Sequence, residues 1–302
     1  MGLFDFFKKS DQSDPAPVLG DDYTSKLIRK LRRCHFSDVL DWIADDPRVP
    51  ASVLDDMLTY CDDRTKTSIA YSKCASANAL DRLARESYPP VRDYAARNPR
   101  LPKELIEELS HDSEERVRAG VARNPAASPS VLAELAAEDS HEINFGLAHT
   151  PSTPTRILEK LCRDGEYLVR WGAAENKATP PDILARIVKC PYRDVKIRVA
   201  SNRNSPAEAL EDLANSYSEE VRRRVAGNHA APGWLLRQMS DDSNANVRAD
   251  VAANPSTPPD ALRKLYHMYP RPDYPLAKNP STPDDILEDL VLSSDDIYGA
   301  PF

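Results

Sequence analysis

Residues 247–265 read VRADVAANPSTPPDALRKL, and this pattern of valine, asparagine, proline and leucine recurs along the chain. The asparagine returns every 26 residues, with Thr150 in one slot of the series, and Asn279 follows the last full interval after 25. Self-similarity at a fixed period indicates a repeat architecture. The asparagines on the 26-residue grid are Asn98, Asn124, Asn176, Asn202, Asn228 and Asn254.

If the residue after each asparagine is position 1, repeats begin at residues 47, 73, 99, 125, 151, 177, 203, 229, 255 and 280. A leading repeat over 21–46 fits the same apolar pattern, and the repeat over 280–302 is truncated. The sequence therefore predicts one array over residues 21–302, preceded by an apolar segment and a linker over residues 1–20. The apolar residues of the leading repeat are Leu27, Ile28, Leu31, Val39, Ile43 and Ala44.

Each repeat predicts two short helices. Apolar residues at positions 7, 8 and 11 form the stripe of a first helix, and those at 19, 23 and 24 form the stripe of a second. A Ser/Thr-Pro pair near positions 3 and 4 suits a hydroxyl N-cap followed by proline at the first helical position. The asparagine suits the left-handed end of the second helix. The pairs are Ser128-Pro129, Thr153-Pro154, Thr179-Pro180, Ser205-Pro206, Thr257-Pro258 and Thr282-Pro283.

A single repeat of this kind cannot bury its own apolar stripes, whereas stacked repeats can. We therefore predict an all-α fold, an α-solenoid superhelix of about ten to eleven 26-residue, two-helix repeats. In repeat 255–279, Pro270, Pro272 and Pro275 fall where the second helix would run, so we expect a bend or loop there. The acidic repeat 280–302 is expected to cap the array.

The recurrent string V-R-x-x-V-A-x-N-P-x-T-P-x-x-x-L-x-x-L resembles the leucine-rich repeat variant family. It is present here as Val247-Arg248, Val251-Ala252, Asn254-Pro255, Thr257-Pro258, Leu262 and Leu265. The resemblance covers most of residues 47–290 and implies a solenoid similar to those of HEAT proteins. It implies a scaffold and no particular reaction.

Composition excludes several classes of protein. The 302 residues carry a net charge of −8, with 9 glycines and 26 prolines. No apolar run is long enough to span a membrane, and no secretory signal precedes the first charges. The middle of the chain has no basic excess, which argues against a nucleic-acid partner. The five cysteines are odd in number and form no C-x2-C pair, so we predict a reduced, cytoplasmic protein.

Position 20 is basic in seven repeats, which indicates a column with one cation per repeat. One interpretation is a track for phosphates or an acidic peptide. The other is a structural ladder, in which each cation pairs with an acid at position 14 of its own or a neighbouring repeat, such as Glu86, Asp112, Asp164 or Asp242. The cations are Lys66, Arg92, Arg118, Arg170, Lys196, Arg222 and Arg248.

Position 21 lies roughly opposite position 19 on a helix, so we expect it to face outward. In three successive repeats it is large and apolar, as Phe145, Trp171 and Ile197, and His149 accompanies the first. An apolar column on an exposed face is typical of an interaction site. These four residues are the predicted partner-binding residues. The alternatives are that local curvature buries position 21 or that sequence drift produced these residues.

The aromatic start of the chain, from Met1 to Lys9, is interpreted as a weak membrane or partner contact, or as a cap on the first repeat. Phe6 stands where a myristoylation signal requires serine or threonine. No triad, phosphate-binding or metal-binding motif occurs, so we predict no catalytic residue, no metal and no cofactor. The leading hypothesis is a non-enzymatic scaffold that binds a protein or peptide on one face. The alternative is a nucleic-acid or phosphate binder that uses the position-20 cations.

Overall fold

The computed structural model describes residues 26–29, 31, 37–46, 48–268 and 275–298. Within these residues every regular element is a helix, which confirms the all-α class and the α-solenoid character of the repeats. None of the described helices is long and apolar enough to cross a bilayer. The segment over 1–20, Cys34 and the start of the leading repeat lie outside the described residues.

The chain forms two compact units, residues 1–154 and 155–302. In the first unit, the first helices of successive repeats are α4 (Ala51–Met57), α6 (Ala77–Ala84), α8 (Lys103–Leu109) and α10 (Pro129–Leu135). The second helices are α3 (Ser37–Asp45), α5 (Asp63–Tyr71), α7 (Pro89–Arg97), α9 (Glu115–Ala122) and α11 (His141–His149).

The second unit repeats the same alternation. Its first helices are α12 (Thr155–Asp164), α14 (Pro181–Ile187), α16 (Ala207–Ala214), α18 (Gly233–Met239) and α20 (Pro259–Met268). Its second helices are α13 (Tyr167–Glu175), α15 (Arg193–Ser201), α17 (Glu219–Ala226) and α19 (Ala245–Ala253). A 3₁₀ turn, η1 (Pro275–Lys278), and the helix α21 (Asp284–Tyr298) follow.

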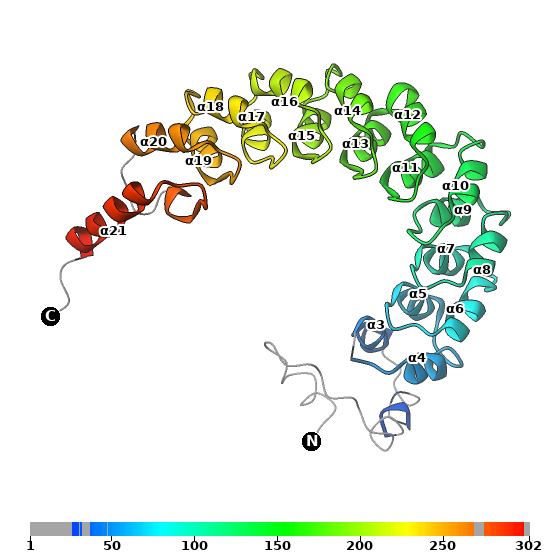
Figure 1. Cartoon of the computed structure of the whole chain (residues 1–302). Coiled ribbons are helices and arrows are strands. Elements are labelled where there is room, and N and C mark those ends of the chain that lie inside the picture. The colour runs from blue at the N-terminus through cyan, green and yellow to red at the C-terminus, as the bar shows by residue number, and fades with distance from the viewer. Residues whose placement is uncertain (1–25, 30, 32–36, 47, 269–274, 299–302) are drawn as a thin grey trace. The chain divides into compact units, whose positions relative to one another are not determined.

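Within each unit, helices of the same kind contact one another. Helix α7 contacts α5 and α9, and α15 contacts α13 and α17, while α6 contacts α4 and α8. The second helices thus line one face of each unit and the first helices line the opposite face (Figure 1). We call the former the second-helix face. The predicted stripes lie between the two layers, as the burial of Ile157, Leu158 and Leu161 on α12 illustrates.

The recurrent asparagine ties each repeat to the one before it. The Nδ2 of Asn124 donates to the carbonyl oxygens of Ala96, at 2.6 Å, and Asn98, at 2.9 Å. Its Oδ1 accepts from the N–H of Ala126 at 2.8 Å. The predicted left-handed helix end is wrong, because the cap residue Asn98 has φ −69° and ψ 124°, an extended conformation. The asparagine is required for its buried side-chain amide, which satisfies backbone groups that would otherwise lack partners.

Thr150 occupies the asparagine position and bonds through its hydroxyl. Its hydroxyl lies 2.6 Å from the carbonyl oxygen of Ala122 in the preceding repeat and 3.1 Å from that of Gly146 in its own helix. A hydroxyl has one proton, whereas an amide nitrogen has two. The threonine hydroxyl therefore has one proton to share between these carbonyl oxygens, whereas the asparagine Nδ2 has one for each of its two.

The Ser/Thr-Pro pairs act differently from the prediction in most repeats. Thr179 donates to the carbonyl oxygen of Ala173 at 2.6 Å and so closes the end of the preceding helix, while Pro180 occupies the N-cap position. The expected arrangement occurs at Ser128, whose hydroxyl accepts from the N–H of Val131 at 3.3 Å with Pro129 in the first helical position. The register differs by one residue because the serine is at position 4 in that repeat.

The last two repeats, 255–279 and 280–302, depart from the two-helix pattern. In repeat 255–279, η1 (Pro275–Lys278) stands where a second α-helix would otherwise run, and residues 269–274 lie outside the described residues. Repeat 280–302 keeps a first helix, α21, and its Ile286 and Leu290 are buried. The retained first helix is present, and the expected bend at Pro270 and Pro272 lies outside the described residues.

Candidate ligand-binding face

The position-21 residues Phe145, Trp171 and Ile197 lie on α11, α13 and α15, and all three are half-buried. The expectation that position 21 faces outward is wrong at Asp93 and Ala119, which are fully buried. The reason is close approach of adjacent second helices, since a Cβ placed on Gly120 of α9 would lie 2.7 Å from Oδ1 of Asp93 on α7. Position 21 therefore lies at the edge of a helix–helix contact rather than opposite one.

In the first unit, Phe145 is held between a histidine and an arginine. Its ring centroid lies 4.3 Å from that of His149. The guanidinium of Arg123, the residue that follows α9, lies 5.4 Å from the centroid of the Phe145 ring. Nδ1 of His149 is 2.8 Å from the carbonyl oxygen of Phe145. The structure thus brings two of the predicted site residues together and adds a cation that the sequence analysis did not select.

Burial and the neighbouring charge of Arg97 lower the pKa of the Arg123 guanidinium. Arg97 itself makes two 2.7 Å bonds to the buried carboxylate of Asp93, and Arg116 adds a third at 2.8 Å. The three arginines border a hollow of about 330 Å³ together with His141, Glu142 and Phe145. The Asp93 carboxylate forms ion pairs with both Arg97 and Arg116. Arg123 donates instead to the carbonyl oxygen of Ala119.

In the second unit, Trp171 is covered by an arginine of the following repeat. The Arg198 guanidinium lies 4.4 Å from the Trp171 ring centroid. Its Nη1 donates to Oε1 of Glu175 at 3.2 Å, and its buried Nε has no hydrogen-bond partner among the residues that the structure describes. Arg198 and Glu175, but not Trp171 itself, line a hollow of about 550 Å³ together with Lys177, Arg203 and Asn204. Ile197 precedes Arg198 on the same helix and is not among the residues lining this hollow.

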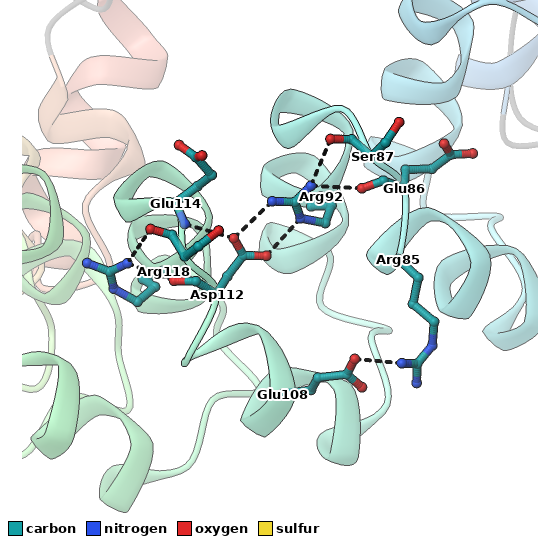
Figure 2. A network of polar contacts seen from close by, with 9 residues as sticks. Arg85, Glu86, Ser87, Arg92, Glu108, Asp112, Glu114 and Arg118 are labelled. Atoms are coloured by element: carbon teal, nitrogen blue, oxygen red, sulfur yellow. Dashed lines mark hydrogen bonds and ion pairs between the residues drawn. The ribbon is translucent and has the colours of Figure 1, made fainter.

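The position-20 cations lie along a different edge of the repeats, and several are paired with the position-14 acid of the next repeat. Arg92 binds both carboxylate oxygens of Asp112, at 2.7 and 2.9 Å, and its Nη1 donates to the carbonyl oxygens of Glu86 and Ser87 (Figure 2). The corresponding pairs are Lys66 with Glu86, Arg118 with Glu138, and Arg222 with Asp242.

The electrostatics of these pairs are those of a closed network. Burial raises the pKa of Asp112, but the hydrogen bonds from Arg92 and the Glu114 N–H together lower it more, so it lies below its ordinary value. The bonds to Asp112 raise the pKa of Arg92. Figure 2 also shows Arg118 reaching the carbonyl of Asp112, which connects one pair to the next.

Where position 14 of the next repeat is not acidic, the cation is bound differently. For Arg170, position 14 of the next repeat is Cys190. Arg170 donates instead to the carbonyl oxygens of Gly165 and Arg163, at 2.7 and 3.0 Å. For Lys196, position 14 of the next repeat is Ser216, and among the described residues the Lys196 ammonium has no carboxylate partner. Arg248 donates to the carbonyl oxygen of Asp242 at 2.5 Å. Asp164, an expected ladder acid, pairs with its neighbour Arg163 at 2.9 Å.

A metal-ligating cluster or a reactive thiol among the described residues would indicate chemistry other than binding. In the described ranges, no three His, Cys, Asp or Glu side chains gather closely enough to hold a metal ion. Burial raises the pKa of the Cys61 thiol to about 11 and that of Cys162 to about 12. Both thiols are therefore protonated, and hence weak nucleophiles, at neutral pH.

The sequence analysis missed Arg123 and Arg198, which lie at positions 25 and 22 of their repeats. Neither position is basic throughout the array, so periodicity did not single them out. The available signal was an arginine within one repeat of each position-21 aromatic residue. It also missed the buried Asp93, whose partners Arg97 and Arg116 come from two different second helices.

No protein-family model matches the sequence, and no curated protein matches it. Among solved structures, the chain is similar to a leucine-rich repeat variant with a repetitive structural motif, at 23% identity and a TM-score of 0.47, over 82% of this chain and 97% of that one. It is also similar to an engineered protein, at 17% identity and a TM-score of 0.35, over 92% of this chain and 99% of that one.

Proposed function

We propose that this chain is a non-enzymatic repeat scaffold that binds segments of another protein on the second-helix face of each unit. In the first unit Phe145 and His149 supply the apolar contact and Arg123 a cation over the Phe145 ring. In the second unit Trp171 and Ile197 supply the apolar contact and Arg198 a cation over the Trp171 ring. A cytoplasmic location is part of the proposal and rests on the number and spacing of the cysteines.

The observation that carries this proposal is the stacking of an arginine on each position-21 aromatic residue. The guanidinium-to-ring distances are 5.4 Å for Arg123 on Phe145 and 4.4 Å for Arg198 on Trp171. Aromatic residues and arginine are the residue types enriched at the energetic centres of protein interfaces. Their half-burial limits the conformational entropy that they lose when a partner orders them.

The alternative function, nucleic-acid or phosphate binding through position 20, is less well supported. The guanidinium groups of Arg92, Arg118 and Arg222 already bind carboxylates of the next repeat. An incoming phosphate would have to displace those carboxylates, each of which lies within the protein at no entropic cost of association. The alternative predicts affinity that falls steeply with salt, whereas the proposed apolar contact does not.

The test is selection of binders from a random peptide library, followed by affinity measurements on the full chain and two tryptophan variants. Trp171→Ala should lower affinity by roughly 30-fold, since loss of an interface tryptophan costs about 2 kcal/mol. Trp234→Ala is the matched control, because Trp234 is 46% exposed on a first helix, α18. It should leave affinity unchanged.

Two outcomes would overturn the proposal. One is equal affinity of both tryptophan variants and the unmodified chain for every selected peptide. The other is the failure of Arg198→Ala to weaken binding, and this variant leaves the Trp171 ring in place if Trp171→Ala proves to unfold the chain. Circular dichroism melting of each variant separates loss of binding from loss of fold.

A further inference from the structure

We propose that the hollow beside Trp171 binds a phosphorylated serine or threonine side chain on the bound protein segment. The inference rests on the proposed function and adds the chemical identity of one anchor. It uses only the second unit, where α13 and α15 and the loops that follow them border the hollow of about 550 Å³.

The hollow carries more positive than negative charge. Lys177, Arg198 and Arg203 line it together with one acid, Glu175. Glu175 pairs with Arg198, and within the described part of the chain neither Lys177 nor Arg203 has a carboxylate partner. A phosphoryl group brings a charge of about −1.5 to −2 at neutral pH, which matches the surplus of two.

Arg198 is already positioned to receive an anion. Trp171 supports one face of its guanidinium at 4.4 Å, and Glu175 holds Nη1 at 3.2 Å. These contacts fix the plane of the group, and a planar, fixed guanidinium presents its donors to a phosphate with little further ordering. Among the described residues the buried Nε has no hydrogen-bond partner, so Glu175 and the ring leave the donors of this guanidinium incompletely satisfied.

The next hollow along the same unit provides an internal contrast. It also contains two arginines, but Arg223 binds Asp250 at 2.8 Å and Arg224 binds Glu220 at 2.6 Å. Its charges are balanced, so it offers no net attraction to an anion. The hollow beside Trp171 therefore carries a surplus of positive charge that the neighbouring hollow of the same unit lacks.

A phosphopeptide suits the hollow better than a nucleic acid does. Nucleic acids present a phosphate at every nucleotide and are bound by rows of cations. Here the hollow holds one small group of cations, the next hollow of the unit is balanced, and the whole chain has a net charge of −8. A carboxylate side chain would bring one negative charge and two acceptor atoms, fewer than a phosphoryl group offers.

The experiment uses two matched peptide libraries that differ only at one fixed central residue, serine in one and phosphoserine in the other. Selected sequences are synthesised with serine, phosphoserine and glutamate at that residue, and binding to the full chain is measured by fluorescence anisotropy. We expect the phosphoserine form to bind at least about tenfold more tightly than the serine form, as charge-assisted bonds to a phosphate allow.

The variant arm compares Arg203→Ala with Arg224→Ala. Arg203→Ala should remove most of the preference for phosphoserine while leaving affinity for the serine peptide unchanged. Arg224→Ala, in the balanced hollow, should change neither. Both arginines are exposed, and neither belongs to the hydrogen bonds of the recurrent asparagines, so neither variant is expected to unfold the chain.

The inference is overturned if serine and phosphoserine peptides bind equally, if glutamate replaces phosphoserine without loss, or if Arg203→Ala keeps the full preference. It is also overturned if a single-stranded oligothymidylate binds with the affinity of the phosphopeptide. Failure of both libraries to yield any binder would count against the proposed function itself. Binding of serine peptides that depends on Trp171 would uphold that function while rejecting the phosphate anchor.

Discussion

Arginines occur in two settings on the second helices, and the contrast between them separates structure from binding. Arg92, on α7, is 13% exposed and is surrounded by a carboxylate and two backbone carbonyls. Arg198, on α15, is 37% exposed and lies over an aromatic ring, and its Nε has no partner within the described part of the chain. The first guanidinium joins two repeats, and the second faces an open hollow.

The difference is set by the following repeat rather than by the arginine. A cation at position 20 is neutralised when position 14 of the next repeat is acidic, as at Asp112, Glu138 and Asp242. Arg198 is at position 22 instead of position 20, and position 14 of the next repeat is Ser216, which is not acidic. A repeat protein can thus use one residue type both to hold its repeats together and to contact a partner.

The largest expected effect comes from opening a closed pair. Asp112→Ala leaves Arg92 buried without its carboxylate, which should lower the free energy of unfolding by about 3 kcal/mol in urea titrations. Asp182→Ala is the control, because Asp182 is 65% exposed in its pair with Arg186. An exposed pair contributes at most about 1 kcal/mol. Similar losses in both variants would show that the closed pair is not special.

The second prediction concerns acid. The pKa values of Asp112 and Asp242 are lowered in the folded chain, so between the unfolded and folded pKa values the unfolded state binds more protons. The stability that these groups contribute is complete above about pH 4 and is lost as pH falls through the folded pKa values. Urea unfolding from pH 6 to pH 2 should show this decline, and an Asp112→Asn, Asp242→Asn double variant should show a shallower one. Equal slopes would refute the assignment.

The third prediction converts an open slot into a closed one. Ser216 stands at position 14 opposite Lys196, and its Oγ accepts from the N–H of Ser218 at 3.2 Å, as Oδ1 of Asp242 accepts from Asn244 at 2.8 Å. Ser216→Asp should keep that bond and gain Lys196, which would stabilise the chain by about 0.5 kcal/mol at low salt. Asn215→Asp makes the same charge change one residue earlier and should not stabilise. An equal gain from both would indicate a nonspecific charge effect.

The smallest effect is expected at Cys162, close to the open slot of Arg170. Burial raises the pKa of its thiol to about 12, and the charge of Arg170 offsets only part of that rise. At pH 8 roughly one molecule in 10⁴ would carry the thiolate. Iodoacetamide labelling followed by peptide mass spectrometry should leave Cys162 unmodified in the folded chain, with or without Arg170→Ala. Rapid labelling of the folded chain would show that the slot is more open than its contacts indicate.

Much of the repeat structure could be predicted from spacing. The 26-residue grid located the two helices of each repeat, and a distance of 20 residues between a basic position 20 and an acidic position 14 was enough to suggest the ladder. The binding face was predicted only in part. Position 21 was selected by helical geometry, which describes one helix and takes no account of the neighbour that buries Asp93 and Ala119.

The chemical roles of the conspicuous residues also depended on the stack. The asparagine was expected to end a helix, yet its Nδ2 binds carbonyls 26 and 28 residues earlier, as Asn254 does with Asn228 and Ala226. The threonine of the Thr-Pro pair was expected to begin a helix, yet it closes the preceding one. Both signals were visible, and their partners lay across a turn or in another repeat.

The sequence by itself determined the period, the helix pairs and the apolar stripes, because these follow from the order of residues within one repeat. Only the tertiary structure decided which guanidinium groups are satisfied and which face a hollow. That outcome depends on the distance between side chains of successive second helices, as between Arg198 and Trp171. Such distances arise when repeats stack, and no single repeat contains the atoms that set them.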